Sequence, residues 1–303
     1  SKRPMSRVVD PLTSMGKEIS TNFGKAPIQI IGGNIKDNFE YVMPIASAQV
    51  KSSLMLASLS SGNSIKITEP KITRDHTEKM IEYLGGSIEV SKSSEGKTIF
   101  LKNSKLSKIS TYEVVGDFSS AAFIIVAALI SKNSEVMIKN VGLNKTRSGL
   151  LEVLLKMNAN IEIINKTKTC NEDCGDIIVK SSNLEGINVP NSIIPNIIDE
   201  IPILSVAASF AKGQTIIKNA SELKVKESDR LHATSMGLKT MNIKHDLLDD
   251  GLIINGTQDD VEIHEEIESF GDHRIAMSFL IAGLRSKNGV KVRDCSNIET
   301  SFP

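Results

Sequence analysis

The sequence has few aromatic residues and no excess of charge of either sign. Tryptophan is absent from the 303 residues, aromatic residues make up 4% of them, and Lys plus Arg equals Asp plus Glu at 36 each. A nucleic-acid-binding surface usually leaves a basic excess and often offers aromatic side chains for base stacking. The composition therefore argues against a nucleic-acid partner and predicts that any bound anion is held by a local cluster of basic residues.

Cysteines and long apolar runs are also scarce. Cys170, Cys174 and Cys295 cannot form a fully paired disulfide framework, and no second ligand pair accompanies Cys170 and Cys174. We therefore expect reduced cysteines and no metal site. No apolar run is expected to span a membrane, and the first residues lack a signal-peptide core. These absences predict a cytoplasmic protein with no membrane partner.

The densest charge cluster lies at residues 224–230, which read Lys-Val-Lys-Glu-Ser-Asp-Arg. In an extended segment Lys224 and Lys226 would share one face. Ser228 is a candidate helix cap, and Glu227 and the arginine lie three residues apart, close enough to be neighbours on a helix. A helix start with fixed positive charges favours a small, multiply anionic ligand.

The ordinary alternative for such a window is a solvated helix start with local ion pairs. A second cluster, Gly-Asp-His-Arg at residues 271–274, makes the functional interpretation stronger. Taken alone, His273 is more often a structural residue than a catalyst, and Asp199 could serve only to cap a buried helix.

Two types of repeated unit alternate along the chain. The first opens with a polar residue and continues into an apolar helix and a strand; its copies start at Ser47, Asp117, Asp199 and Asp272. The second is an amphipathic helix followed by a strand; its copies start at Arg3, Arg74, Arg147 and Arg230, spaced by 71, 73 and 83 residues. Gly or Asn after each of these helices predicts a left-handed stop, and the regular period predicts a repeated supersecondary unit.

The apolar helices predict an inside-out architecture. Residues 120–128 read Ser-Ala-Ala-Phe-Ile-Ile-Val-Ala-Ala, which is apolar nearly all round and is typical of a buried helix. If such helices form the centre, the strands and amphipathic helices must lie outside them. Both ends of the sequence fall within a repeat, so we expect a piece of a longer protein.

Seven segments together resemble one family. They are Arg3-Pro4-Met5, Ser47-Ala48-Gln49-Val50-Lys51, Arg74-Asp75-His76-Thr77-Glu78, Asn144-Lys145-Thr146-Arg147, Asp199-Glu200, Lys226-Glu227-Ser228-Asp229-Arg230 and Asp272-His273-Arg274. In this order, from Lys2 to Pro303, the chain resembles the EPSP synthases (3-phosphoshikimate 1-carboxyvinyltransferases). The resemblance implies the α/β enolpyruvyl transferase fold, a two-domain inside-out α/β barrel of βαβαββ-type repeats, incomplete here.

The resemblance also implies how the domains divide. Residues 1–116 would form a partial first domain with two of its three repeats. Residues 117–303 would form the second domain, with three buried helices and without its final helix. The active site of the family lies between the domains, and the family expectation is a monomer.

The implied reaction transfers the enolpyruvyl group of phosphoenolpyruvate to the 5-hydroxyl of shikimate 3-phosphate in the shikimate pathway, without a cofactor or metal. Asp199 would take the proton of that hydroxyl, Glu227 would exchange a proton with the enolpyruvyl methylene, and Lys226 would lie between the two substrates. This addition and elimination needs an acid, a base and several cations.

The resemblance assigns binding residues as well. The implied shikimate 3-phosphate ligands are Ser47, Ala48, Gln49, Thr73, Asp199 and Lys226. The implied phosphoenolpyruvate ligands are Arg3, Gln49, Arg230 and Arg274, with His273 lining the site. Forked, permanently charged guanidinium groups suit such anions. Arg74 and Arg147 are instead expected to form structural ion pairs at helix starts.

The sequence departs from the family pattern in several places. Ala48 stands where many relatives have serine, Glu222 where some have asparagine, and Thr300 where some have lysine. The Asp-Lys-Ser and Asn-x-Gly-Thr segments of the family do not occur, so we expect this chain by itself to be inactive. Its Ser-Ala-Gln-x-Lys, Arg-x-His-x-Glu and Asn-x-Thr-Arg segments resemble the class II subgroup, which is associated with glyphosate insensitivity.

Two alternatives remain at this point. The related UDP-N-acetylglucosamine enolpyruvyl transferase uses a cysteine on a mobile loop as its acid, and no cysteine lies within residues 1–116. A non-catalytic binding protein on the same fold would not need Asp199, Lys226 and Glu227, all of which are retained. A third option, an RNA-end-processing enzyme of similar fold, is not supported by the charge balance.

Overall fold

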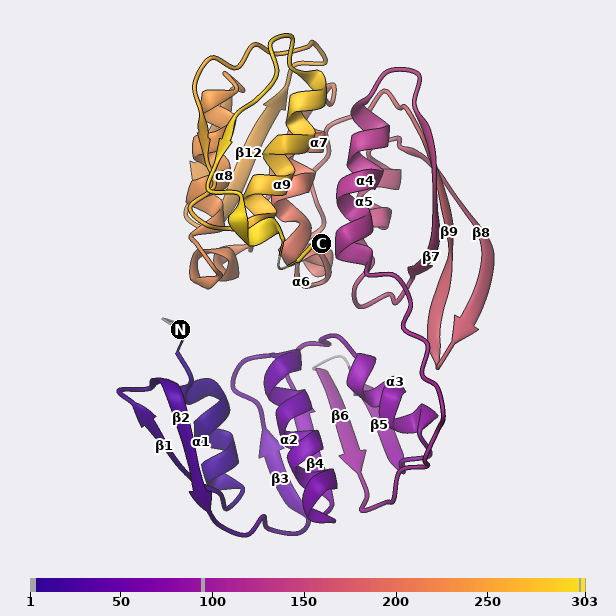
Figure 1. The fold of residues 1–303 in the computed structure, drawn as a ribbon, viewed down its shortest axis with the longest axis vertical. Helices are drawn as coiled ribbons and strands as arrows, with labels where there is room; N and C mark the ends of the chain where they lie inside the picture. The colour runs from indigo at the N-terminus through magenta and orange to yellow at the C-terminus, as the bar shows by residue number, and fades with distance from the viewer. Residues whose placement is uncertain (1–3, 94–95, 300, 303) are drawn as a thin grey trace. The chain divides into compact units, whose positions relative to one another are not determined.

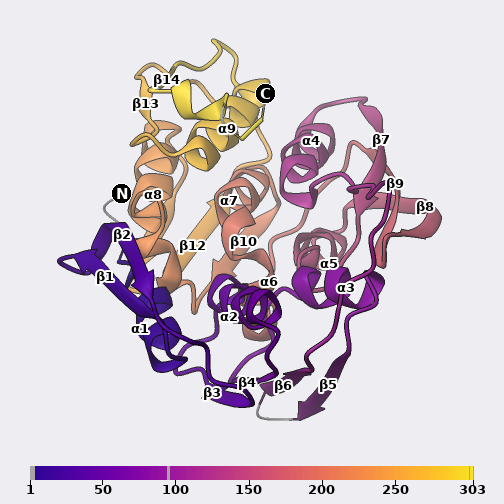
Figure 2. The same ribbon diagram turned by 60° about the horizontal axis from the view of Figure 1, so that its bottom comes forward.

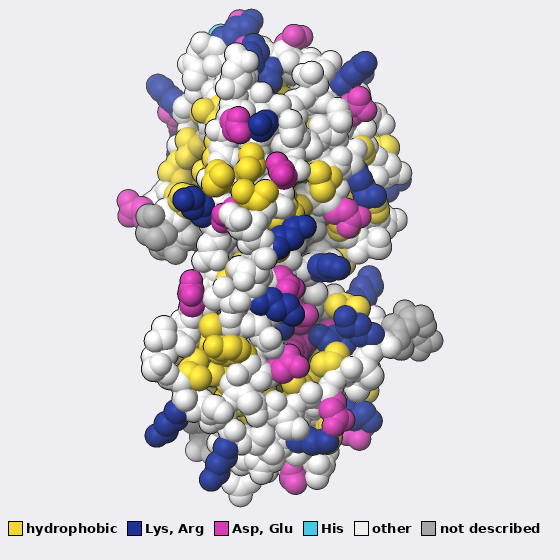
Figure 3. Space-filling model, turned by 90° about the vertical axis from the view of Figure 1, so that its right-hand side faces the viewer, with side chains coloured by type: hydrophobic (Ala, Val, Ile, Leu, Met, Phe, Trp, Pro, Cys, Tyr) yellow, Lys and Arg dark blue, Asp and Glu magenta, His cyan; other side chains and the backbone are white. Residues whose placement is uncertain are grey.

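The computed structural model describes residues 4–93, 96–299 and 301–302. The chain divides between Glu113 and Val114 into two compact units, each with its own buried hydrophobic cluster. Figure 1 draws the helices and strands of both units, with labels on many of them. Side chains of both signs are spread over the face drawn in Figure 3, as expected for a chain without net charge.

The first unit contains one four-stranded sheet and a separate two-stranded hairpin. Its elements are α1 (Ser6–Ser14), β1 (Glu18–Asn22), β2 (Lys25–Gly32), β3 (Phe39–Val42), α2 (Ala48–Ser61), β4 (Ile65–Glu69), α3 (His76–Tyr83), β5 (Ile88–Ser93) and β6 (Gly96–Leu101). The sheet order is β3-β4-β6-β5; β3 and β4 are parallel and the other neighbours antiparallel. β3 to β6 with α2 and α3 therefore make one complete βαβαββ repeat.

The second unit repeats this pattern around a helical centre. Its elements are α4 (Phe118–Ile130), β7 (Glu135–Gly142), α5 (Gly149–Lys156), β8 (Asn160–Thr169), β9 (Glu172–Lys180), α6 (Ile194–Ile197), α7 (Ile201–Ser209), β10 (Gly213–Ile217), α8 (Arg230–Thr240), β11 (His245–Leu248), β12 (Gly251–Gly256), β13 (Ile267–Glu268), α9 (His273–Ala282) and β14 (Val292–Arg293). The sheet orders are β7-β9-β8, β10-β12-β11 and β13-β14.

Three apolar helices form the core of the second unit. α4, α7 and α9 contact one another, and Figure 2 shows them grouped inside the sheets. α7 is buried along its whole length because its sequence is apolar on every side. Asp117 begins α4 by accepting hydrogen bonds from the backbone N–H groups of Ser119 and Ser120, each at 3.2 Å. The predicted inside-out α/β arrangement is confirmed.

The four helices of the second repeated unit are each followed by a left-handed residue, as the sequence predicts. Gly16, Gly85, Asn158 and Asn242 follow α1, α3, α5 and α8 with φ values of 116°, 82°, 68° and 56°. Glycine and asparagine adopt this conformation at little cost, which turns the chain sharply out of the helix. The same backbone conformation thus ends the helix in every copy of the second repeated unit.

One apolar helical stretch has the length of a membrane span but belongs to the core of the second unit. Asn191–Ser209 is helical, long and apolar enough to cross a membrane by length and composition. It consists of the 3-10 helices Asn191–Ile193 and Ile198–Glu200 with α6 and α7, and most of it is buried inside the second unit. A core helix of a folded domain meets the same criterion because both environments exclude water.

Candidate active site

A buried arginine joins three carboxylates at the start of α8. Arg230 donates from Nε to Asp272 Oδ2 at 2.8 Å, from Nη1 to Asp199 Oδ1 at 3.1 Å, and from Nη2 to Glu227 Oε2 at 2.6 Å. Only 1% of its side chain is exposed. Burial opposes its charge, but the carboxylates outweigh burial and hold the pKa of Arg230 above its ordinary value. This guanidinium fixes three chain segments to one another.

Asp272 anchors this arrangement from α9. Its side chain is fully buried, accepts from the backbone N–H of Arg274 at 2.9 Å, and also accepts from Ser228 Oγ at 3.1 Å. Burial raises the pKa of Asp272, but the charge and hydrogen bonds of Arg230 act more strongly and leave it below the ordinary value. Asp272 is therefore ionised and serves both as a helix cap and as the partner of Arg230.

Asp199 lies among cations that come from different elements. It sits on the 3-10 helix Ile198–Glu200, with 13% of its side chain exposed. Lys226 Nζ lies 3.5 Å from Oδ1, and Arg147 Nη1 lies 3.4 Å from Oδ2. Together with Arg230, these groups stabilise the negative charge of the carboxylate.

Arg274 and Glu200 extend the cluster to α9 and to the start of α7. Arg274 Nη1 donates to the Asp199 carbonyl at 3.1 Å and to Glu200 Oε1 at 3.4 Å. Glu200, with 1% of its side chain exposed, also accepts from Ser119 Oγ. Burial is the main reason that the pKa of Arg274 lies below its ordinary value, and the charges of Arg230 and Arg147 add to it.

The predicted ligands in the first unit lie around the start of α2 and the end of β4. Ser47 Oγ caps α2 by accepting from the backbone N–H of Val50 at 3.4 Å, and Ala48 is the first residue of that helix. Gln49 Oε1 accepts from Arg7 Nη2 at 3.1 Å. Thr73 Oγ1 donates to Glu69 Oε2 at 2.7 Å. Arg3 and Thr300 lie outside the described residues.

A buried charge network connects those segments. Lys51 Nζ lies 2.7 Å from Glu78 Oε1 and 3.2 Å from Glu69 Oε2, and Lys97 Nζ lies 2.8 Å from Glu78 Oε1. All four side chains are at most 5% exposed. Since Glu69 also accepts from Thr73, the network ties the loop after β4 to helices α2 and α3.

Comparison with known proteins decides the family. A profile of EPSP synthase (3-phosphoshikimate 1-carboxyvinyltransferase) matches residues 1–303. The chain belongs to the EPSP synthase family. The 3-phosphoshikimate 1-carboxyvinyltransferases of Bartonella quintana and Petrotoga mobilis are 44% and 45% identical to it, over the whole chain and 69% of each relative.

Solved structures agree with this assignment. An EPSP synthase from Acinetobacter baumannii superposes with a TM-score of 0.87 at 40% identity, covering 100% of this chain and 69% of that one. The enolpyruvyl transferase NikO from Streptomyces tendae superposes with a TM-score of 0.76 at 14% identity and shares the fold. The predicted enolpyruvyl transferase fold is confirmed.

The structure brings together five of the residues that the EPSP synthase resemblance implies. Asp199, Lys226, Glu227, Arg230 and Arg274 lie in one network of the second unit. The half-buried His273 lies beside it; burial lowers its pKa, and the charge of Arg274 lowers it further. The roles of all six residues stay predictions.

Local structure around residues 224–230 differs from the sequence prediction. Lys224 lies in the 3-10 helix Ser221–Val225, so it and Lys226 are not on one face of an extended segment. Asp229, not Ser228, caps α8 and accepts from the backbone N–H of His232 at 3.1 Å. Ser228 precedes the helix and donates to Asp272 instead. Serine and aspartate are equally good caps, so their adjacent positions left the start of α8 ambiguous by one residue.

Two expectations about single residues have different outcomes. Arg147, just before α5, forms ion pairs as expected, and its partners include Asp199 Oδ2 at 3.4 Å and Asp117 Oδ1 at 3.6 Å. Asp199 does not cap α7, because Glu200 occupies the N-cap position and makes no side-chain cap hydrogen bond. The contact between Arg147 and Asp199 joins residues 52 positions apart, which sequence spacing does not reveal.

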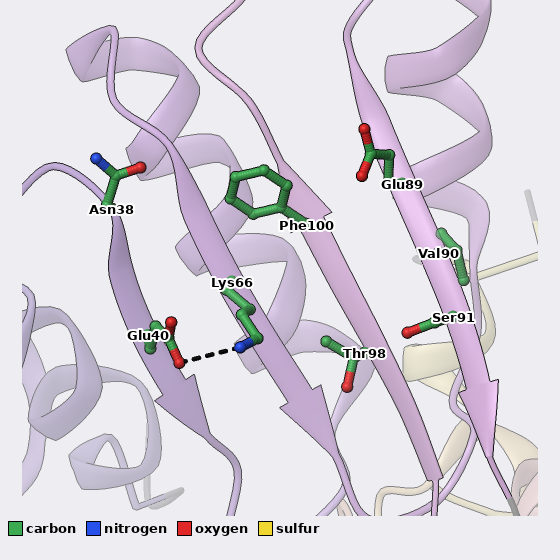
Figure 4. Close-up of a pocket in the computed structure, with 8 residues that line it drawn as sticks. All are labelled: Asn38, Glu40, Lys66, Glu89, Val90, Ser91, Thr98 and Phe100. Atoms are coloured by element: carbon green, nitrogen blue, oxygen red, sulfur yellow. Dashed lines mark hydrogen bonds and ion pairs between the residues drawn. The ribbon is translucent and has the colours of Figure 1, made fainter.

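The other candidate sites offer fewer groups that could take part in a reaction. A shallow hollow over the four-stranded sheet is shown in Figure 4; it is lined by Asn38, Glu40, Lys66, Glu89, Val90, Ser91, Thr98 and Phe100. Lys66 and Glu40 form an exposed ion pair there at 3.2 Å. Within residues 4–93, 96–299 and 301–302, no group of three His, Cys, Asp or Glu side chains could hold a metal ion.

Proposed function

We propose that this chain takes part in enolpyruvyl transfer from phosphoenolpyruvate to the 5-hydroxyl of shikimate 3-phosphate, giving 5-enolpyruvylshikimate 3-phosphate and phosphate. Family membership over all 303 residues supports this function. The observation that carries it is the position of Asp199, a partly exposed carboxylate within 3.5 Å of Lys226, Arg147 and Arg230. A carboxylate held in this way is ionised and oriented, as a general base must be.

The family resemblance supplies the proposed roles, and the contacts of each side chain support them. Asp199 accepts the proton of the 5-hydroxyl as that oxygen attacks carbon 2 of the enolpyruvyl group. Lys226 contacts Asp199 and lies between the two substrates, where its charge stabilises the anionic tetrahedral intermediate. Glu227 is 35% exposed and held by Arg230, so it can exchange a proton with the methylene carbon.

The substrates are anions, and the proposed ligands are mostly cations or hydrogen-bond donors. We assign phosphoenolpyruvate to Arg3, Gln49, Arg230 and Arg274. We assign shikimate 3-phosphate to Ser47, Ala48, Gln49, Thr73, Asp199 and Lys226. Guanidinium groups bind carboxylates and phosphates through paired hydrogen bonds, which fixes orientation as well as affinity.

Replacement of the proposed base provides the direct test. Because the Asp-Lys-Ser and Asn-x-Gly-Thr segments do not occur in these residues, calorimetric binding of shikimate 3-phosphate is the first readout and phosphate release the second. The amide oxygen of Asp199→Asn can still accept a hydrogen bond from the 5-hydroxyl but cannot take its proton. We therefore expect this variant to bind the ligand within about threefold of the unmodified chain and to reduce any phosphate release about 100-fold or more. The exposed Asp246→Asn is the control.

Three results would contradict the proposal. Absence of shikimate 3-phosphate binding would favour a non-catalytic protein on this fold. Faster phosphate release with UDP-N-acetylglucosamine would favour the related transferase. Undiminished phosphate release in Asp199→Asn would remove Asp199 from the reaction.

We further propose a cytoplasmic monomer of the class II type, without a nucleic-acid or membrane partner. The equal numbers of basic and acidic residues support the absence of a nucleic-acid partner. The class II assignment predicts that glyphosate competes poorly with phosphoenolpyruvate. Tight binding of glyphosate in the presence of shikimate 3-phosphate, measured by calorimetry, would contradict it.

A further inference from the structure

The Asn-x-Thr-Arg segment forms a tightly bonded turn that holds Arg147 in place. Asn144 is buried, and its Oδ1 accepts from the backbone N–H of Thr146 at 2.9 Å and from Thr146 Oγ1 at 2.7 Å. Its Nδ2 donates to Glu172 Oε2 at 3.0 Å, which ties the turn to β9. The backbone N–H of Arg147 donates to the Asn144 carbonyl at 2.8 Å. These hydrogen bonds hold the backbone of Arg147 in place. Its guanidinium therefore extends toward the carboxylates from a fixed position.

The guanidinium of Arg147 lies within 4.0 Å of three carboxylates. Nη1 lies 3.4 Å from Asp199 Oδ2 and 4.0 Å from Glu200 Oε1, and Nη2 lies 3.6 Å from Asp117 Oδ1. Its side chain is 13% exposed, so solvent screens these interactions only weakly. Arg147 thus contributes a full positive charge close to the proposed base.

Cations approach the two oxygens of Asp199 from separate elements. Arg147, from the turn before α5, approaches Oδ2, whereas Lys226 and Arg230, from the segment before α8 and from α8 itself, approach Oδ1. Arg274 on α9 binds the carbonyl of the same residue. The carboxylates of this cluster, which partly offset these charges, are Glu200, Glu222, Glu227, Asp272 and Asp117.

We propose that Arg147 is a positioning residue that orients the Asp199 carboxylate and keeps it ionised until it accepts the proton. This inference rests on the proposed function of Asp199 as the base. Arg147 acts through its charge and through the direction from which it approaches Oδ2. The Asn144 turn supplies the rigidity that this geometry needs.

Titration of Asp199 tests the inference without requiring turnover. The pH dependence of the Asp199 carboxyl ¹³C resonance, assigned with Asp199→Asn, is followed in the unmodified chain and in variants. Arg147→Gln and Arg147→Met remove the charge with differently shaped side chains, and Arg147→Lys retains it. Lys156→Gln, on α5 and half-exposed, removes the same charge away from Asp199.

Loss of a cation beside a carboxylate disfavours its ionised form. We therefore expect the titration midpoint of Asp199 to rise by about 1 pH unit in Arg147→Gln and Arg147→Met, by less than half of that in Arg147→Lys, and not at all in Lys156→Gln. Unchanged midpoints in folded neutral variants would overturn the proposal, and so would failure of both to fold, which would make Arg147 purely structural.

Binding of shikimate 3-phosphate to the same samples separates the two hypotheses. A midpoint shift in a chain that does not bind this ligand would reject the proposed function and uphold the link between Arg147 and Asp199. Ligand binding without a midpoint shift would uphold the proposed function and reject the link between Arg147 and Asp199.

Discussion

At the scale of single residues, Arg230 and Asp272 are the most interdependent pair. Both side chains are at most 1% exposed, and Nε donates to Oδ2 at 2.8 Å. Removal of one partner leaves a buried charge without full compensation, which typically costs about 3–5 kcal/mol. This pair therefore fixes the fold around the site as well as its charge.

Asp272→Asn tests this dependence. The folded pKa of Asp272 lies below its unfolded value, so its contribution to stability is fully present above the unfolded value and is lost as pH falls through the folded one. We expect the free energy of unfolding to fall by about 3 kcal/mol at pH 7. The difference from the unmodified chain should shrink below about pH 4. Denaturant unfolding across pH, with Asp246→Asn as the control, measures both effects.

Equal stability of Asp272→Asn and the unmodified chain at pH 7 would contradict the interpretation. A difference that grows toward acid pH would also contradict it, because the sign of the linkage would be reversed.

The residues of the site were predictable where local spacing or family motifs carried the signal. The Glu227–Arg230 ion pair follows from their separation of three residues and is observed at 2.6 Å. Arg147 was assigned a structural role because nothing in its own segment indicates Asp199, 52 residues away. The pairing of Glu200 with Arg274 was not predicted either, because these residues are 74 positions apart. Such contacts exist only once the three central helices have packed.

At the scale of elements, periodicity predicted the architecture well. Apolar residues on every side identified α4 and α7 as buried, and Gly or Asn identified the ends of the amphipathic helices. The sequence did not predict that the stretch before α7 breaks into 3-10 and α-helical turns. That break places Asp199 on a short 3-10 helix at the site instead of on a long regular helix.

The packing of α8 against α9 depends on one small residue. A Cβ atom on Gly237 would lie 2.0 Å from Cζ of the fully buried Phe279. Gly237→Ala would ordinarily favour a helix by about 1 kcal/mol, yet here we expect a net loss of about 1–3 kcal/mol through overpacking. Thermal unfolding of this variant beside Met236→Ala, at an exposed position of α8, measures the effect. A stabilised Gly237→Ala would show that Phe279 moves aside freely.

At the scale of the whole molecule, the two units have separate hydrophobic clusters. One contains residues between Met15 and Leu101, and the other residues between Phe118 and Ala282. The first unit additionally buries the Lys51 network, and the second the Arg230 network. Each unit therefore has its own core and its own buried ion pairs.

Calorimetric unfolding should show this division as two transitions. Lys51→Met removes a positive charge that balances the buried carboxylates of Glu69 and Glu78. It should lower the free energy of unfolding by about 3 kcal/mol in the first unit only. Gly237→Ala should lower only the other transition. Lys66→Met, at an exposed ion pair, is the control for the first unit. A single transition lowered by both variants would contradict two separately stabilised units.

The charge cluster of the second unit has one more consequence, for proton uptake. Four cationic side chains, Arg147, Lys226, Arg230 and Arg274, lie among six carboxylates, so anionic groups outnumber cationic ones before any ligand is present. The carboxylates are Asp117, Asp199, Glu200, Glu222, Glu227 and Asp272. Each arriving phosphate or carboxylate adds negative charge to a cluster that has no positive surplus. Protons from the buffer must then accompany the substrates, and the measured heat of binding should vary with the ionisation enthalpy of the buffer.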